Sequence, residues 1–339
     1  MTRRITTLLA ALALLAATIG LAACGEKPEG EQGEAEPFSL ILDFYPNPDH
    51  VGIYQAQKLG YFRDAGLDLS IEVPSDPAAP IKQVAAGRAD LAISYEPEVL
   101  LAREQGLDVK AVGALVDQPL TSLIWLGKSQ IKGIADLRGK TIATAGIPYQ
   151  DAFLQTILAR ADLTTEDVKK VNVGLNLLPA IVGGRAQAML GGFSNVEGVD
   201  LRQRKLNPIV TPVDRLGIPT YDELVFVANA SRIEEDPEPI RLFLAALARG
   251  TAAAVENPKA ATAALQEQNP NLDPKLTAAE VKATIPVLSQ ATAEHPYGYM
   301  NRDQWAQFIG WMRDQGLISS LPAPEAVLTE ELLPGTIPD

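Results

Sequence analysis

The chain has 339 residues, of which 47% are hydrophobic and 21% charged, as in an ordinary globular protein of about two domains. Its 29 Lys and Arg stand against 42 Asp and Glu; this net charge of -13 provides no basic surface for a nucleic-acid partner. One cysteine excludes an intramolecular disulfide framework, a cysteine-based zinc site and a four-thiolate iron–sulfur cluster, and two histidines argue against a histidine-rich metal site. We therefore expect no metal ion.

Residues 1–23 have the layout of a secretory signal, because two arginines precede an uncharged apolar stretch over residues 5–23. That stretch is long enough to span a bilayer, so a retained transmembrane anchor is the alternative. The sequence LAACG at 21–25 resembles the bacterial lipobox, in which the cysteine is acylated, and Cys24 is the only thiol of the chain. We predict a lipoprotein signal peptide at 1–23 and lipidation at Cys24.

The segment 24–37 is rich in glutamate and glycine and has too few apolar residues to form a core. We predict an acidic tether there, with the folded part outside the cytoplasmic membrane. Because the chain is acidic, attachment to the membrane would come from the acyl chains on Cys24 rather than from electrostatic attraction.

From residue 38 onward, short apolar stretches alternate with stretches of helical spacing, which predicts an α/β fold with a parallel or mixed sheet covered by helices. Pro80 suits the first turn of a helix and Gly87 suits its end. The first unit is predicted to contain strands at 39–44, 67–73 and 91–94, with helices at 51–59 and 80–86.

A second unit repeats this layout. The sequences AGRADL at 86–91 and GGRAQA at 183–188 both indicate a helix end followed by a strand. We therefore predict two similar lobes. The second has strands at 141–145, 171–173 and 188–190, and helices at 149–161 and 178–183.

The last third reads as one strand at 223–228 followed almost entirely by helices, at 237–255, 258–266, 278–288 and 302–315. Since that strand has no following parallel partner, we expect the chain to return to the first lobe. The predicted organisation is lobe 1 at 38–121 plus 224–339 and lobe 2 at 122–223, joined by a hinge of two crossings.

Aromatic and polar side chains follow the predicted strands of both lobes, where open α/β sheets place their ligands. The segments are 43–50, 94–98, 146–150 and 191–197. Their rings can enclose a flat heterocycle, and their carboxylates and amides can bond its nitrogens. Among them, Tyr45, His50 and Tyr149 are candidate ligand-binding residues.

Structural roles are the alternatives for these residues. The segment 43–50 can be a turn stiffened by two prolines, in which Asn47 and Asp49 bond the backbone, and His50 can cap a helix. Glu96 and Glu98 flank Pro97 in a predicted turn, and nothing near them resembles a reaction partner, so we expect no acid–base catalysis there. Neither glycine pair, at 183–184 or 191–192, has the spacing of a phosphate loop.

These segments resemble one known family over much of residues 42–265: the thiamine-pyrimidine-precursor binding proteins of ABC transporters, relatives of the fungal thiamine pyrimidine synthases. The family's opening pattern D-W-x-P-N-x-x-H-x-G is matched at Asp43, Pro46, Asn47, His50 and Gly52. Phe44 stands in place of the tryptophan, which keeps a flat face but lacks the indole N–H. Further matches are G-Y-F at 60–62, G-x-A-D at 87–90, I-S-Y at 93–95 and N-x-E-G at 195–198.

The resemblance implies the type II periplasmic-binding-protein fold, in which two α/β lobes close on a ligand. It implies a monomeric, lipid-anchored receptor on the extracytoplasmic face of the cell membrane, which delivers a thiamine pyrimidine precursor to an ABC permease and its ATPase. The residues it implies for holding the pyrimidine are Phe44, Asn47, Tyr95, Glu96, Asn195 and Glu197.

Two other functions remain open from the sequence. Riboflavin receptors share much of the pattern, and Phe44 and Ser194 leave room for a wider ring system. The fungal synthases are enzymes that use a lysine-bound pyridoxal cofactor and a cysteine-rich iron motif. Because this chain has no thiol after Cys24, we expect no cofactor and no enzymatic activity.

Overall fold

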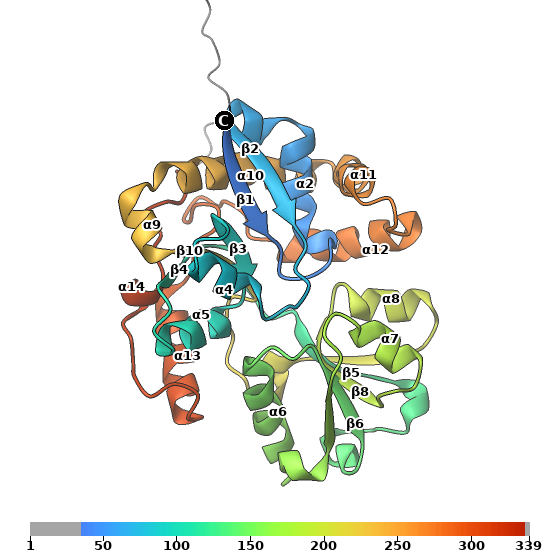
Figure 1. Cartoon of the computed structure of the whole chain (residues 1–339). Helices are drawn as coiled ribbons and strands as arrows, with labels where there is room; N and C mark the ends of the chain where they lie inside the picture. Colours follow the sequence, from blue (N-terminus) through green and yellow to red (C-terminus); the bar gives the residue numbers. More distant parts are fainter. Residues whose placement is uncertain (1–34, 336–339) are drawn as a thin grey trace, which may run out of the picture. The chain divides into compact units, whose positions relative to one another are not determined.

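The computed structural model describes residues 35–335 and contains two five-stranded sheets, each with its own set of covering helices (Figure 1). The predicted signal peptide at 1–23, the lipidation site Cys24 and most of the predicted tether lie outside the described residues. Glu36 and Pro37, which the sequence assigned to the tether, begin the first strand instead.

The first sheet has the strand order β2-β1-β3-β10-β4. β1 is parallel to β2 and β3, whereas β10 runs antiparallel to β3 and β4. After the second sheet is complete, the chain therefore returns to the middle of the first. The strands are β1 (Glu36–Ile41), β2 (Leu67–Glu72), β3 (Leu91–Ser94), β4 (Val109–Val116) and β10 (Leu224–Asn229).

The second sheet has the order β7-β6-β8-β5-β9. β6 is parallel to β7 and β8, and β5 is antiparallel to β8 and β9. Both sheets thus have a parallel core and an antiparallel strand, β10 in the first and β5 in the second, that directly follows a connection between the sheets. The predicted α/β class is confirmed. The strands are β5 (Thr121–Leu126), β6 (Thr141–Thr144), β7 (Lys169–Asn172), β8 (Ala188–Phe193) and β9 (Pro208–Pro212).

Helices cover the faces of both sheets, which is why central strands such as β3 and β5 are mostly apolar and are buried over their whole length. Around the first sheet lie α2 (Val51–Lys58), α3 (Tyr61–Asp64), α4 (Pro80–Ala85) and α5 (Glu96–Glu104), and around the second α6 (Tyr149–Ala159), α7 (Leu177–Val182) and α8 (Glu197–Gln203). The tail adds α9 (Ala230–Glu235), α10 (Glu238–Glu256), α11 (Pro258–Gln268), α12 (Pro274–Thr284), α13 (Arg302–Asp314) and α14 (Pro324–Val327).

Short 3-10 turns link several of these elements: η1 (Pro48–His50), η2 (Gly127–Ser129), η3 (Ile134–Leu137), η4 (Thr165–Asp167), η5 (Val213–Leu216) and η6 (Ile285–Val287). Among the helices of residues 35–335, none combines the length and the apolar character that crossing a bilayer requires.

The matched helix ends predicted from the sequence have the same backbone geometry. Gly87 has φ 66° and Gly184 has φ 73°, the left-handed conformation that favours glycine and closes the preceding helix. The segment 94–98 is not the turn that the sequence predicted, because α5 begins at Glu96. Pro97 is compatible with this helix since the first turn needs no backbone N–H donor.

The longest helix, α10, crosses α2 at very short range. A Cβ atom added to Gly250 of α10 would lie 2.4 Å from the Cβ of Ala56 and 2.5 Å from the carbonyl oxygen of Gly52. On the same helix, the ring of Phe243 stacks against Phe62 at 5.2 Å. The glycine lets the two backbones approach, and the ring pair packs α10 against α3.

Two segments connect the sheets, residues 117–120 and 213–223, and one side chain ties them together. Glu223, on the second segment, accepts hydrogen bonds from the backbone N–H groups of Leu120 and Thr121, both at 2.6 Å, and from the Thr121 hydroxyl at 2.7 Å. The hydroxyl of Tyr221 donates to the same carboxylate at 3.0 Å. The crossings are thus fixed to each other where the sheets meet.

Candidate functional site

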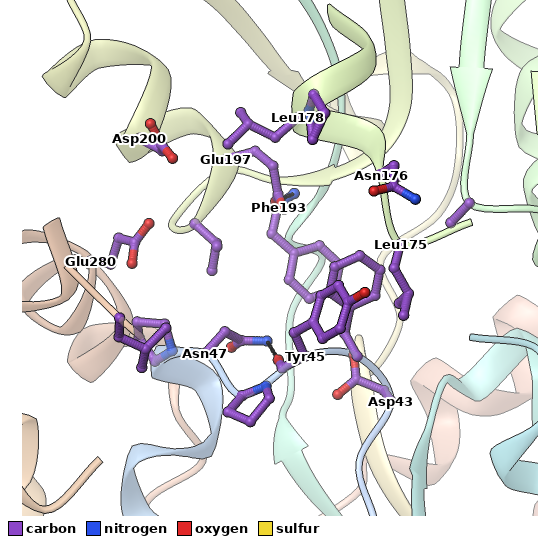
Figure 2. A pocket seen from close by; sticks show the side chains of 18 of the residues that line it. Asp43, Tyr45, Asn47, Leu175, Asn176, Leu178, Phe193, Glu197, Asp200 and Glu280 are labelled. Carbon is purple, nitrogen blue, oxygen red and sulfur yellow. Dashed lines mark hydrogen bonds between the residues drawn. The ribbon is translucent and has the colours of Figure 1, made fainter. Parts of the chain in front are cut away.

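A cavity of about 340 Å³ lies between the two halves of the molecule, within the size range of small-molecule sites, about 300–1,000 Å³ (Figure 2). The first half contributes residues 43–48 after β1, Tyr95 after β3 and residues 272–280 around the start of α12. The second contributes residues 145–150 after β6, residues 175–179 after β7, and residues 191–200 at and after the end of β8. The parallel strands of both sheets therefore end at one cavity, where α/β folds bind ligands.

Aromatic rings from both halves line this cavity. Tyr95 and Tyr149 come from opposite halves, and their ring centroids lie 5.5 Å apart. Phe44 packs edge-on against Tyr45 at 5.7 Å, and Tyr45 is 50% exposed. Figure 2 shows Tyr45 and Phe193 meeting at the centre of the cavity from opposite sides. Such rings can cover the faces of a flat ligand.

A buried hydrogen-bond chain positions Tyr95. Its hydroxyl donates to Oδ2 of Asp43 at 3.1 Å, and Oδ1 of Asp43 lies 2.9 Å from Nε2 of His50. The Nδ1 atom of His50 accepts the backbone N–H of Asn47 at 3.2 Å. Because Nδ1 is the acceptor, the proton is on Nε2, which donates to Asp43. His50 thus helps to fix the position of Tyr95 through Asp43 and does not itself line the cavity.

Asn47 lines the cavity, but its side-chain amide is hydrogen-bonded to the backbone of its own loop. Its Oδ1 accepts the backbone N–H of Asp49 at 2.8 Å, and its Nδ2 donates to the carbonyl of Tyr45 at 3.1 Å. Together with His50, it forms a capping box at the start of η1. This is the capped turn that the sequence left open as the alternative.

One end of the cavity is acidic. Burial raises the pKa of Glu197 to about 7. The hydrogen bond of 2.7 Å that Glu197 accepts from the backbone N–H of Phe193 acts in the opposite direction and limits this rise. Burial, and then the nearby charges of Glu197 and Asp200, raise the pKa of Glu280 to about 8. Asp200 pairs with Arg204 outside the cavity, with Nη2 and Oδ2 3.0 Å apart. No lysine, arginine, histidine or cysteine is among the described residues that line the cavity.

The structure brings most of the predicted residues together around the cavity: Phe44, Tyr45, Asn47, Tyr95, Tyr149 and Glu197. His50, Glu96 and Asn195 do not line it, because each is buried and bonded elsewhere. Glu96 accepts the backbone N–H of Asp222 at 2.7 Å, and burial raises its pKa well above the usual range. Asn195 donates to Asp49.

Sequence reasoning missed Glu280 as a lining residue. It lies on α12, more than two hundred residues after the first cavity-lining loop, in a helix whose sequence gives no sign of a site. Asp200, in the first turn of α8, was missed for a similar reason, since the sequence predicted no helix there.

The described lining of the cavity offers rings, amides and carboxylates, and it offers no lysine amine or cysteine thiol. Residues 35–335 contain no group of three or more histidine, cysteine, aspartate or glutamate side chains placed to hold a metal ion. The synthase cofactor, which is held through a lysine, therefore does not fit this lining.

Comparison with known proteins gives the family. Residues 47–261 match the family model described as "NMT1/THI5 like", which is more than half of the chain. The chain belongs to the NMT1/THI5-like family. The family resemblance predicted from the sequence is thereby confirmed.

Two relatives of this NMT1/THI5-like chain are each 34% identical to it. One is a thiamine biosynthesis protein of Haemophilus influenzae, aligned over 297 residues, 87% of this chain and 91% of the relative. The other is a formylaminopyrimidine-binding protein of Halalkalibacterium halodurans, aligned over 304 residues, 89% of this chain and 92% of the relative. A 4-amino-5-hydroxymethyl-2-methylpyrimidine phosphate synthase of Legionella pneumophila is 28% identical over 255 residues, 74% of this chain and 80% of the enzyme.

Among solved structures, the alkanesulfonate-binding protein of Xanthomonas axonopodis pv. citri superposes with a TM-score of 0.67. The match covers 88% of this chain and 99% of that one at 16% identity. At this identity the similarity speaks for the fold alone, and it confirms the predicted periplasmic-binding-protein fold of the NMT1/THI5-like chain.

Proposed function

We propose that this chain is the solute receptor of an ABC importer for a thiamine pyrimidine precursor of the hydroxymethyl- or formylamino-pyrimidine type. The observation that carries the proposal is the cavity between the two halves, with aromatic rings from both sheets and carboxylates at one end. A substituted aminopyrimidine matches this lining, since it has two flat faces and several N–H donors at its edge. The formylaminopyrimidine-binding relative supports the ligand class.

The proposed ligand contacts are the faces of Phe44, Tyr45, Tyr95 and Tyr149, with Glu197 bonding a nitrogen of the ligand and Asn47 shaping the loop. No covalent bond is made or broken. The ligand is bound, shielded from water and released to a permease, which an ATPase drives.

Closure follows from a ligand that touches both halves. Only a ligand with higher affinity for the closed form shifts the equilibrium toward it. We propose that the halves, lobe 1 at 38–121 plus 224–339 and lobe 2 at 122–223, rotate about the two crossings that Glu223 ties together. In the structure the halves meet at Tyr149, whose backbone N–H lies 3.4 Å from Oε1 of Glu98.

The cellular arrangement is also part of the proposal. Cleavage after residue 23 and acylation of Cys24 would anchor a monomeric receptor on the extracytoplasmic face of the cell membrane, beside its permease. The acidic tether would let the folded part stand at a distance from the bilayer surface.

The proposal is tested by calorimetric titration of the purified chain with 4-amino-5-hydroxymethyl-2-methylpyrimidine, its formylamino relative, thiamine and riboflavin. We expect micromolar or tighter binding of one of the two pyrimidines, and weaker or no binding of riboflavin. Tight binding of riboflavin alone would contradict the proposed pyrimidine ligand and would leave the proposed receptor role in place. Product formation from a bound pyrimidine would contradict a receptor role.

A further inference from the structure

Glu280 is a buried carboxylate that lines the cavity and has no hydrogen-bond donor among the described residues. Its exposed fraction is 6%, and α12 carries it to the cavity wall. The protein has removed most of the water around this carboxylate and supplies no donor in its place, so the contact left to its oxygens is with the cavity. A fold that keeps one at a binding cavity leaves it available for a donor on a ligand.

The neighbours of Glu280 raise the cost of a negative charge on it. Glu197 and Asp200 face it from α8 in the other half, Asp49 from η1, and Asp273 from the start of its own helix. All four are acids, and the described cavity lining contains no positively charged side chain. Figure 2 shows Glu280 and Asp200 on opposite sides of this end of the cavity, with Glu197 beside them.

The other acids at this end already have partners. Glu197 accepts the backbone N–H of Phe193, and Asp200 pairs with Arg204. Asp49 accepts the amide of Asn195, and Asp273 caps α12 through the backbone N–H groups of residues 275 and 276. Glu280 is thus the carboxylate of this end that the protein leaves without a donor.

We propose that Glu280 is a specificity-determining residue: it accepts a hydrogen bond from an amino group or a protonated ring nitrogen of the ligand, and with Glu197 and Asp200 it excludes phosphate esters. The inference rests on the proposed function and deepens it. An amine supplies the donor that Glu280 lacks, and a charge-assisted bond of this kind is among the stronger ones. A phosphate group carries a charge of about -1.5 to -2 and would lie against these carboxylates without a cation.

This residue lies outside the part of the chain that the family model matches, residues 47–261. It comes from the helical tail, which the topology returns to the first half, and its helix packs against α8 of the second half. A ligand held by Glu280 and Glu197 together therefore contacts both halves, which is the condition for ligand-driven closure.

The test compares the wild-type chain with Glu280→Gln, which keeps the shape and removes the charge. The matched control is Glu294→Gln, which removes one negative charge from an exposed bend after the end of α12, outside the cavity lining. Calorimetric titrations at pH 8.5, above the pKa values of about 7 for Glu197 and about 8 for Glu280, use 4-amino-5-hydroxymethyl-2-methylpyrimidine, its phosphate ester, cytosine and uracil. Thermal unfolding of each variant checks that it folds.

We expect the wild type to bind the aminopyrimidine and to bind its phosphate at least about 100-fold more weakly. Glu280→Gln should weaken binding of the aminopyrimidine at least about tenfold. It should also reduce the ratio between the affinity for the aminopyrimidine and the affinity for its phosphate ester. The control should bind as the wild type does.

Unchanged affinity and preference in a folded Glu280→Gln would overturn the role of Glu280 and leave the proposed function in place. If the wild type binds cytosine but no thiamine pyrimidine, and Glu280→Gln loses that binding, the proposed function fails and the role of Glu280 stands. Binding of uracil or of the phosphate ester as tightly as of the aminopyrimidine would overturn the inference.

Discussion

The side-chain amide of Asn195 donates a hydrogen bond of 2.6 Å to Oδ1 of Asp49, and these two residues belong to opposite halves of the molecule. The same nitrogen lies 2.8 Å from the Thr284 hydroxyl at the end of α12. Oδ2 of Asp49 and Oδ1 of Asn195 have no partner among the described residues. Burial raises the pKa of Asp49 well above its usual range, so its carboxyl can hold a proton. This contact is a polar link between the halves.

Replacing Asn195 by alanine should weaken ligand binding without reaching the cavity. The closed form would lose the link and leave Asp49 and Thr284 buried without their donor, at a cost of about 1–3 kcal/mol, or about 5- to 150-fold in affinity. Titration of Asn195→Ala with the best ligand measures this. An affinity equal to that of the wild type would show that the link does not favour closure.

Tyr45 separates binding from folding, because its ring lines the cavity and is half exposed. Tyr45→Ala should lower affinity by about 1 kcal/mol or more through lost contact with the ligand face. The melting temperature of the free protein should change little. Tyr95→Ala is a poorer probe, since Tyr95 is buried and bonded to Asp43, and its loss would also destabilise the fold. A large drop in the melting temperature of Tyr45→Ala would contradict this assignment.

The free protein should lose stability as the pH rises from about 5 to 8.5. Burial raises the pKa of Glu197, Glu223 and Asp222 to about 7 and that of Glu280 to about 8. In this pH range the folded state binds more protons than the unfolded chain, so the free energy of unfolding falls with pH. Melting temperatures at pH 5.5 and 8.5 measure the effect, and Glu280→Gln should reduce the drop. A protein that is more stable at pH 8.5 would contradict the buried-carboxyl interpretation.

The close crossing of α2 and α10 predicts opposite effects of alanine at two helical glycines. Gly250→Ala places a Cβ 2.4 Å from that of Ala56 and should destabilise the protein by about 1–3 kcal/mol. Gly310→Ala on α13, which has nothing within 4 Å of its added Cβ, should be neutral or stabilise by about 0.5–1 kcal/mol. Urea unfolding of both variants is the measurement. Equal effects would mean that the crossing is looser than the structure shows.

The sequence predicted the strands and most helices because apolar runs and helical spacing are local signals. It placed Tyr95 and Glu197 at the cavity because both follow predicted strands, and parallel strands end at one edge. It assigned His50, Glu96 and Asn195 to the ligand, although the structure uses all three for buried bonds. A residue type at the right loop does not reveal which way its side chain points.

Glu280 shows the other limit of sequence reasoning. Its helix was predicted only in part, at 278–288, whereas α12 spans Pro274–Thr284. Nothing within this helix points to a ligand, because its place at the cavity depends on β10 entering the first sheet between β3 and β4. That return brings the whole tail beside the first half. Such long-range placement leaves no local pattern.

The central claim is that a flat amine-bearing ligand binds in the cavity between the halves. A crystal structure of the chain with 4-amino-5-hydroxymethyl-2-methylpyrimidine tests it most directly. We predict the ring between the aromatic side chains of the two halves, with a ligand nitrogen within hydrogen-bond distance of Glu197 or Glu280. A ligand found on an outer surface, with the cavity between Tyr45 and Phe193 filled by water alone, would contradict the account.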